Sequence, residues 1–372
     1  MIRTALMTLA LICAADRASA LTDMPFNPHP TEVDYVVTMN FVSGPSKGVI
    51  TVTHHAGWLR VDRTISSITI PRTTTTYYGR KDKVSVQLHT STDGETVSIY
   101  SGTYDPLAHY RPTGERQTYL GEQCSVWKYD LGETTQRLKC VTDDGIEVWD
   151  RFISTHKQGQ TYFEATKIER RMVDKTEVYP PRHVLDLEYW LKLKSPKAGP
   201  LFQLSAEVVL EHIETPSWSK IVRQIGPWYF RLERQNDVIS SLRIVDLSAG
   251  FNLQYSQIVS GGKMLQISSR PPADHKVAFP FLSAHETGEN ETLLGEECKW
   301  FDMARGWIDV NHFQCLTSDG VLLKEKGWGY GSKTNANTPP SEATKLTRGA
   351  VKLDDIMPPK ELLLRSTWGL PE

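Results

Sequence analysis

Few residues of this sequence could carry chemistry. His54 and His55 are adjacent, so on a strand their side chains would point to opposite faces, which does not suit two ligands of one metal ion. Glu122 and Glu296 recur in two copies of the sequence Leu-Gly-Glu, and a recurring carboxylate is a candidate for acid–base catalysis. No second titratable partner recurs beside them, so a role at a turn or strand edge next to a cysteine is the simpler interpretation. We therefore predict no catalytic residue, no metal and no cofactor, and we expect that the protein is not an enzyme.

The tryptophans are the other candidates for a functional surface. Trp58, Trp127, Trp228 and Trp300 are distributed along the sequence. They could pack in a thin β core, where tryptophan buries well. Alternatively, they could line the concave face of a bent sheet that holds an apolar ligand or a partner. Both interpretations stay open at this point.

An internal repeat determines how these residues must be positioned. Residues 113–124 (TGERQTYLGEQC) and 287–298 (TGENETLLGEEC) match at eight of twelve positions, at an offset of 174. The match continues in both directions, and the offset drifts from 171 to 178, as small loop insertions would cause. Such a repeat indicates a duplicated domain. We predict copy one over 31–192, a linker over 193–199, and copy two over 200–366.

The composition and the local patterns favour strands. The chain has 372 residues with 25 glycines and 21 prolines, and its apolar residues alternate with polar ones. Hairpins are expected at Asp93-Gly94 and Gly261-Gly262, and again at Asp144-Gly145 and Asp319-Gly320. Helices are expected only over 182–193 and 360–368, each after a Pro-Pro pair. We therefore predict a mainly β fold of two tandem bent antiparallel sheets, half-barrel-like and with little helix.

The cysteines fit an oxidising compartment. Cys13 lies in an N-terminal leader, which leaves Cys124, Cys140, Cys298 and Cys315. Four cysteines allow three pairings, and the duplication selects Cys124–Cys140 with Cys298–Cys315, because a module that was once independent carries its own bond. A redox or metal site is the alternative, but neither pair has the Cys-x-x-Cys spacing.

The N-terminus is typical of a secretory signal peptide. Arg3 precedes an apolar run over 5–15, and Ala18-Ser19-Ala20 is a small-residue cleavage site. We predict cleavage near Ala20 and a periplasmic or secreted location. The formal net charge of −2 gives no reason to expect nucleic acid as a partner.

The order of motifs in each copy resembles the lipoprotein-carrier superfamily, the LolA/LolB-like and RseB-like half-barrels of the bacterial envelope. The resemblance rests on an early Trp-x-Arg-x-Asp strand (Trp58, Arg60, Asp62), successive hairpins and a terminal Pro-Pro pair (Pro180-Pro181, Pro358-Pro359). A closer likeness is to uncharacterised secreted proteins of proteobacteria that share Leu-Gly-Glu-x-Cys, Cys-x-Thr-x-Asp-Gly and Ala-Thr-Lys-x-x-Arg, as in Leu294–Cys298, Cys315–Gly320 and Ala343–Arg348 here. The resemblance implies a concave sheet that holds acyl chains or lipoproteins and has no catalytic residues.

Three functions follow as hypotheses. The leading one is a non-enzymatic periplasmic binding or carrier protein for an apolar ligand, a lipid, a lipoprotein or another envelope component, peripheral to the membrane at most. The alternative is a structural or interaction scaffold of the cell envelope. A hydrolase with an unrecognised site is the third. An apolar cavity lined by tryptophan would favour the carrier, a filled core would favour the scaffold, and a cleft with shifted carboxylates would favour the enzyme.

Overall fold

The chain packs as two compact units in a computed structural model. The first unit comprises Met1–Thr92, Val97–Leu185 and Leu364–Glu372, and the second comprises Asp93–Thr96 and Asp186–Leu363. The residues that the structure describes are 33–66, 72–91, 94–102, 110–132, 135–154, 161–193, 205–212, 217–246, 250–257, 262–269, 285–303, 311–328 and 340–372. The predicted signal peptide (1–20) and residues 194–199 of the predicted linker lie outside these ranges.

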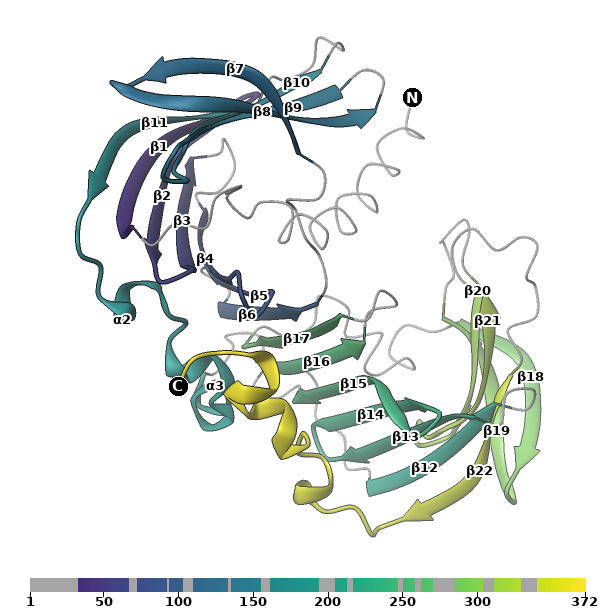
Figure 1. The fold of residues 1–372 in the computed structure, drawn as a ribbon. Helices are drawn as coiled ribbons and strands as arrows, with labels where there is room; N and C mark the ends of the chain where they lie inside the picture. Colours follow the sequence, from purple (N-terminus) through teal and green to yellow (C-terminus); the bar gives the residue numbers. More distant parts are fainter. Residues whose placement is uncertain are drawn as a thin grey trace. The chain divides into compact units, whose positions relative to one another are not determined.

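The first unit is an antiparallel sheet that bends strongly along its length (Figure 1). Its strands pair in the order β7–β8–β9–β10–β11–β1–β2–β3–β4–β5. The strands are β1 (Tyr35–Ser43), β2 (Ser46–His55), β3 (Trp58–Ser66), β4 (Arg72–Gly79), β5 (Val84–Ser91), β7 (Arg111–Tyr119), β8 (Glu122–Gly132), β9 (Thr135–Thr142), β10 (Glu147–Ser154) and β11 (Thr161–Arg170). The strand β6 (Gly94–Ser101) belongs to this unit from Val97 onward.

The second unit repeats this arrangement. Its strands pair in the order β18–β19–β20–β21–β22–β12–β13–β14–β15–β16–β17, again all antiparallel. The strands are β12 (Ser205–His212), β13 (Trp218–Ile225), β14 (Trp228–Gln235), β15 (Val238–Asp246), β16 (Phe251–Gln257), β17 (Lys263–Ser268), β18 (His285–Leu293), β19 (Glu296–Asp302), β20 (Asn311–Thr317), β21 (Leu322–Trp328) and β22 (Ser341–Arg348).

The registers of the two units also correspond. Tyr35 lies opposite Arg170 in the first unit, and Ala206 lies opposite Arg348 in the second. Each pairing then has a register shift, between Thr38 and Met39 and between Val209 and Leu210. Residues that occupy the same place in corresponding strand pairs of the two units are called equivalent below. The prediction of a mainly β fold built from antiparallel sheet with little helix is confirmed.

Short-range turn chemistry explains the hairpins that recur beside the cysteines. Between β9 and β10 the Thr142 hydroxyl accepts from the Ile146 amide at 2.9 Å, and the Gly145 amide donates to the Thr142 carbonyl. Thr317 and Val321 make the same 2.9 Å contact between β20 and β21. Gly145 and Gly320 have positive φ angles of 82° and 87°, in the region that glycine adopts without steric cost. The hairpins predicted at Asp144-Gly145 and Asp319-Gly320 are present.

The stretches 182–193 and 360–368, where the sequence predicts helix, are both helical, but each is broken into two shorter pieces. The first is a 3-10 turn η2 (Arg182–Leu185) and a separate helix α3 (Leu187–Lys192), because the Asp186 side chain caps a new helix by accepting from the Tyr189 amide at 3.2 Å. The second is split by extended backbone at Leu364 into η5 (Lys360–Leu363) and η6 (Arg365–Trp368). Sequence reasoning missed α2 (Lys175–Val178) and η4 (Leu353–Asp355). None of the helices within the described ranges has the length and apolar character to cross a membrane.

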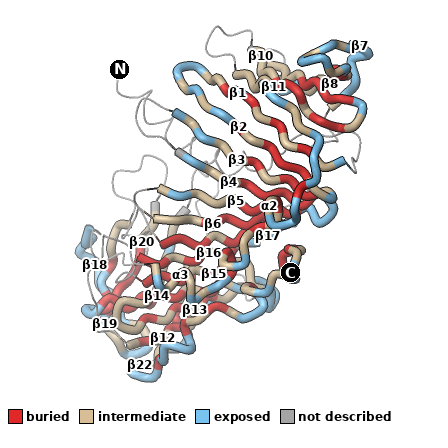
Figure 2. The backbone as a smooth tube through the Cα atoms, turned by 90° about the vertical axis from the view of Figure 1, so that its left-hand side faces the viewer, coloured by how far each residue is buried: buried red, intermediate tan, exposed pale blue. Residues whose placement is uncertain are grey.

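Each unit has its own core and its own disulfide. The bonds are Cys124–Cys140 and Cys298–Cys315, the pairing that the duplication predicts, and all four cysteines are buried. Cys124 and Cys140 belong to a core with Tyr35, Val37 and Leu59, and Cys298 and Cys315 belong to one with Val208, Trp300 and Leu323. Burial is concentrated on the central strands, whereas β7 and β18 are exposed along most of their length (Figure 2).

Candidate functional site

The four candidate tryptophans do not form one surface within either unit. In the first unit Trp58 is buried on β3. Its ring contacts Tyr179 edge-on at 5.6 Å and covers Gly79 so closely that a Cβ there would lie 2.6 Å from Cζ2 of Trp58. Trp127 is half-buried on β8, where it lies directly opposite Lys139 of β9.

In the second unit the two tryptophans also have different surroundings. Trp228 is equivalent to Trp58 and is half-buried, with its ring 6.1 Å from that of Phe251. Trp300 is part of the core, and its indole N–H donates to Glu291 at 3.2 Å. Trp300 is equivalent to Val126 rather than to Trp127, so Trp127 and Trp300 point to opposite faces of corresponding strands.

The two adjacent histidines also point to opposite faces. His54 is buried and stacks on Tyr35 at 5.0 Å, whereas Nδ1 of the half-buried His55 is hydrogen-bonded to Asp34 at 2.9 Å. Within the described residues no group of three or more His, Cys, Asp or Glu could hold a metal ion.

The recurring glutamates have partners that sequence reasoning missed. Glu122 accepts from both terminal nitrogens of Arg170, at 2.7 and 3.0 Å, and Asp144 accepts from Nε of Arg170 at 2.7 Å. In the second unit Glu296 accepts from Nε of Arg348 at 3.0 Å, and Asp319 accepts from the same guanidinium at 2.5 Å. The interpretation that no partner recurs is therefore wrong, because the partners lie at the ends of more distant strands.

This arginine clamp gives the shared motifs one structural role. Leu-Gly-Glu supplies the first carboxylate, Thr-x-Asp-Gly supplies the second, and the arginine ends Ala-Thr-Lys-x-x-Arg. The clamp ties the starts of β8 and β19 to the ends of β11 and β22 within their own units. Its geometry is bidentate and fully paired, which suits a structural contact better than an acid–base pair.

A pocket opens on the inner face of the first unit. One wall is apolar and comes from β1, β2, β3 and β11, and the other is charged and comes mainly from β9 and β10. The lining residues are Met39, Ile50, Val52, Val61, Arg63, Arg137, Lys139, Glu147, Asp150 and Phe163. The cavity volume is about 30 Å³, which is room for a small chemical group rather than for a whole lipid.

The charged wall is an ion network on β9 and β10. Asp150 accepts from Arg137 at 2.6 Å and pairs with Lys139 at 3.2 Å, while Glu147 accepts from Lys139 at 2.7 Å. Arg63 approaches from β3, and its guanidinium lies 5.8 Å from the ring of Phe163. The pocket therefore has three cationic and two acidic side chains beside an apolar wall.

The two acids of the pocket have opposite pKa shifts. Burial raises the pKa of Glu147, and the nearby Asp150 charge adds to this effect, although Lys139 opposes it. Burial also acts to raise the pKa of Asp150, but the charges of Lys139 and Arg137 outweigh it and hold that pKa below its ordinary value. Asp150 is thus the fixed anion of the network, and Glu147 is the acid that takes up a proton more readily.

The second unit has different residues at the equivalent positions. Lys220, Arg231 and Glu233 are equivalent to Ile50, Val61 and Arg63. The buried Lys220 ammonium of β13 donates to Glu325 of β21, so an ion pair links two strands that are not neighbours in the sheet. The charge of Lys220 holds the pKa of Glu325 well below its ordinary value against the effect of burial.

Sequence reasoning missed the whole ion network of the pocket. Arg137 and Lys139 alternate with Leu138 and Cys140, a pattern that is typical of a strand with a solvent-facing side. Lys139 is nevertheless only 2% exposed, because both faces of β9 are covered. The available signal was the run 147–151, in which three of five residues are charged.

Comparison with known proteins adds weak similarity of fold. No protein-family model and no curated protein matches this sequence. The structure of MucB in complex with MucA(peri) is 12% identical, with a TM-score of 0.29 over 68% of this chain and 92% of that one. The MucA/MucB complex of Pseudomonas aeruginosa is 11% identical, with a TM-score of 0.29 over 71% of this chain and 96% of that one. A structure of PNGF-II is 10% identical, with a TM-score of 0.30 over 76% of each chain. TM-scores of this size carry no argument about function.

Proposed function

We propose that this protein is a non-enzymatic binding protein that holds a small amphipathic anion in the pocket of its first unit. The single observation behind this proposal is the pairing of an apolar wall with a cationic wall around one small space. Ligand sites typically combine an apolar surface with a few placed polar groups. A medium-chain carboxylate has matching chemistry, with its head toward the cations and its first methylene groups against Met39 and Ile50.

The charge balance of the pocket favours an anion. Arg63, Arg137 and Lys139 outnumber Glu147 and Asp150 by one charge when both acids are ionised. Glu147 has a raised pKa, so it is the acid that can accept a proton when a second carboxylate arrives. Proton uptake there would release Lys139 to the ligand, while Asp150 keeps Arg137 in place.

The second unit would then have a supporting role. Its Lys220 and Glu325 form a charge pair across the interior, at positions where the first unit has Ile50 and Asp150. A buried lysine that is already paired is a poor receptor for a further anion, since the ligand would have to displace a partner. The two disulfides are typical of an oxidising compartment, and we infer a periplasmic location from them.

Calorimetric titration of the full chain with decanoate, decanol and decyltrimethylammonium tests this proposal. Decanoate should bind with one site per chain, and the other two should bind at least tenfold more weakly. Ile50→Lys and Val61→Arg copy the second unit into the pocket and should abolish decanoate binding. Thr51→Lys is the matched control, because Thr51 neighbours Ile50 on β2 and points to the other face.

Equal binding of all three amphiphiles would contradict the proposed pocket, because it would indicate contact with apolar surface alone. Decanoate binding that survives in both Ile50→Lys and Val61→Arg would place the ligand elsewhere. Circular dichroism of each variant should show the strand signal of the parent protein, which separates a blocked pocket from an unfolded unit.

An interaction scaffold is the second candidate, and the exposed edge strands favour it. β7 and β18 share one exposure pattern, with their first six residues exposed. An exposed edge is a template for adding a strand from a partner. If no amphiphile binds, and a strand-forming peptide protects amide hydrogens of β7 or β18 from exchange, the scaffold is the better description.

A further inference from the structure

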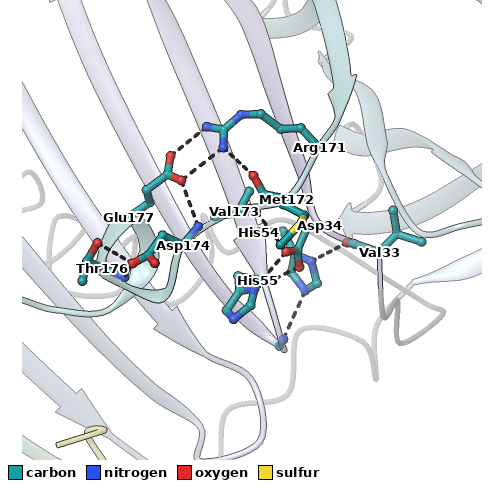
Figure 3. Close-up of polar contacts among 11 residues, drawn as sticks. Val33, Asp34, His54, His55, Arg171, Met172, Val173, Asp174, Thr176 and Glu177 are labelled. Carbon is teal, nitrogen blue, oxygen red and sulfur yellow. Dashed lines mark hydrogen bonds and ion pairs between the residues drawn. The ribbon is translucent and has the colours of Figure 1, made fainter.

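Two histidines of β2 hold the segment that leads into β1 (Figure 3). Nδ1 of His54 lies 2.8 Å from the carbonyl oxygen of Val33, and Nδ1 of His55 lies 2.9 Å from Asp34. Asp34 also accepts from the amide of Val173 at 3.1 Å, in the segment that follows β11. Val33 and Asp34 are therefore held from two directions within the first unit.

The contacts of His54 require a neutral ring. Nδ1 faces a carbonyl oxygen, so it must carry the proton and donate it. Nε2 accepts from the amide of Gly57 at 3.3 Å, so it must be unprotonated. A second proton would make Nε2 a donor, so that it would face the Gly57 N–H without an acceptor between them. It would also place a charge on a ring that is 1% exposed.

The surroundings of His54 also oppose protonation. Burial is the largest effect and lowers the pKa of His54, and the Arg80 guanidinium and His55 act in the same direction. Asp34 favours the charged form, but its oxygens are already engaged by His55 and by the Val173 amide. The face of the ring is covered by Tyr35, whose own pKa is raised to about 12 by burial, so it stays neutral.

The second unit supplies a natural control. Gln224 is equivalent to His54, since it pairs with Ala206 as His54 pairs with Tyr35. Gln224 is also buried, at 6% exposure. A glutamine side chain offers both a donor and an acceptor at any pH, whereas histidine can offer both only when it is neutral.

We propose that His54 is a pH-sensitive latch, which holds Val33 and the turn between β2 and β3 at neutral pH and releases them in acid. The unfolded or released histidine titrates at its ordinary value near 6.5, whereas the latched ring resists the proton. The released state therefore binds more protons as the pH falls below about 6.5, and the latch weakens in that direction. The neighbouring His55 contacts Asp34 at 2.9 Å, so its effect has to be tested separately from that of His54.

Hydrogen exchange of the full chain at pH 7.5 and 5.0, corrected for the intrinsic exchange rates, tests the latch. Peptides that cover 33–40 and 54–61 should lose protection at pH 5.0 in the parent protein, because the released state takes up a proton there and the latched state does not. His54→Gln copies Gln224 and should keep its protection at both pH values. Peptides that cover 205–212 and 224–230 are the internal control and should not change with pH.

An equal loss of protection in His54→Gln would overturn the proposal, because another group would then be responsible. Unchanged protection in the parent protein at pH 5.0 would also overturn it. His55→Gln tests whether His55 contributes to the pH response. This variant removes the contact with Asp34 and should leave the pH response in place. If His54→Gln fails to fold, titration of the His54 ring by NMR decides the matter, and a pKa at or above 6.5 would contradict the latch.

Discussion

Asp150 and Glu325 occupy equivalent positions in the two units, but their cations come from different strands. Asp150 pairs with Arg137 and Lys139 of β9, its neighbour in the sheet. Glu325 pairs with Lys220 of β13, which is not a neighbour of β21. The two units thus have an acid at the same position in the sheet, but its cationic partner comes from a different strand in each. In the first unit the acid lines the pocket, and in the second it forms an ion pair across the interior.

Breaking the ion pair between Lys220 and Glu325 should destabilise the second unit strongly. Glu325→Gln leaves the buried Lys220 ammonium without its main partner, which typically costs about 3–5 kcal/mol. The double change of Glu325→Gln with Lys220→Met removes both charges and should recover most of that loss. Urea denaturation followed by tryptophan fluorescence measures both. A double variant as unstable as the single one would contradict this view of the pair.

Glu147 should make ligand binding depend on pH. Its raised pKa means that binding of a second carboxylate beside Lys139 takes up a proton. Decanoate affinity should then rise as the pH falls toward the raised pKa of Glu147, by at most about tenfold per unit for one proton. Glu147→Gln should bind decanoate with little dependence on pH over this range. Titrations in buffers of different ionisation enthalpy measure the proton uptake, and an uptake of zero in the parent protein would refute the role of Glu147.

The arginine clamp should contribute stability that is lost in acid. Burial opposes ionisation of Asp144, but hydrogen bonds from Arg170 and Thr142 hold its pKa below the ordinary 3.8. The contribution is therefore present above pH 3.8 and lost as the pH falls through the lower folded value. Because the clamp is partly exposed, Arg170→Met should cost only about 1 kcal/mol. Denaturation curves between pH 6 and 2 should show a weaker acid dependence for this variant than for the parent protein.

Each disulfide should stabilise its own unit. Cys124 and Cys140 are 16 residues apart, and closing a loop of this size is worth roughly 3 kcal/mol in the chain-entropy estimate. Replacing both by alanine should lower the stability of the first unit, with little effect on a reporter in the second. Peptide mapping without reduction should recover Cys124 joined to Cys140. Recovery of Cys124 joined to Cys298 would contradict the pairing.

The last residues of the chain should stabilise the first unit. Trp368 is 1% exposed, and the Arg365 guanidinium donates to the carbonyls of Pro180 and Pro181 at 3.0 and 3.2 Å. Trp368→Ala should cost about 3–5 kcal/mol, as is usual for a buried tryptophan. Leu364→Ala is the matched control, because Leu364 is exposed in the same segment. Limited proteolysis should show cleavage within 33–185 in the first variant and not in the second.

Local patterns were enough to predict the scaffold. The repeat at an offset of 174 identified the duplication, and it selected the two disulfides that the structure contains. Alternation and Asp-Gly turns identified strands and hairpins, because these depend on residues close together in the sequence. The helical stretches over 182–193 and 360–368 were also located, but not the break within each, because Asp186 caps a new helix and Leu364 is extended, which Pro-Pro pairs do not reveal.

Only the tertiary structure decided which face of each strand is covered and which charges meet. A period of two separates the faces of β9, but it does not say that the Lys139 face is also enclosed. The pairing of β1 with β11 joins residues more than a hundred positions apart in the sequence. The pairing of these distant strands brings Arg170 to Glu122. The same packing buries His54 against Tyr35 and leaves room beside Ile50. Contacts of this range depend on how the sheet bends, which no short stretch of sequence encodes.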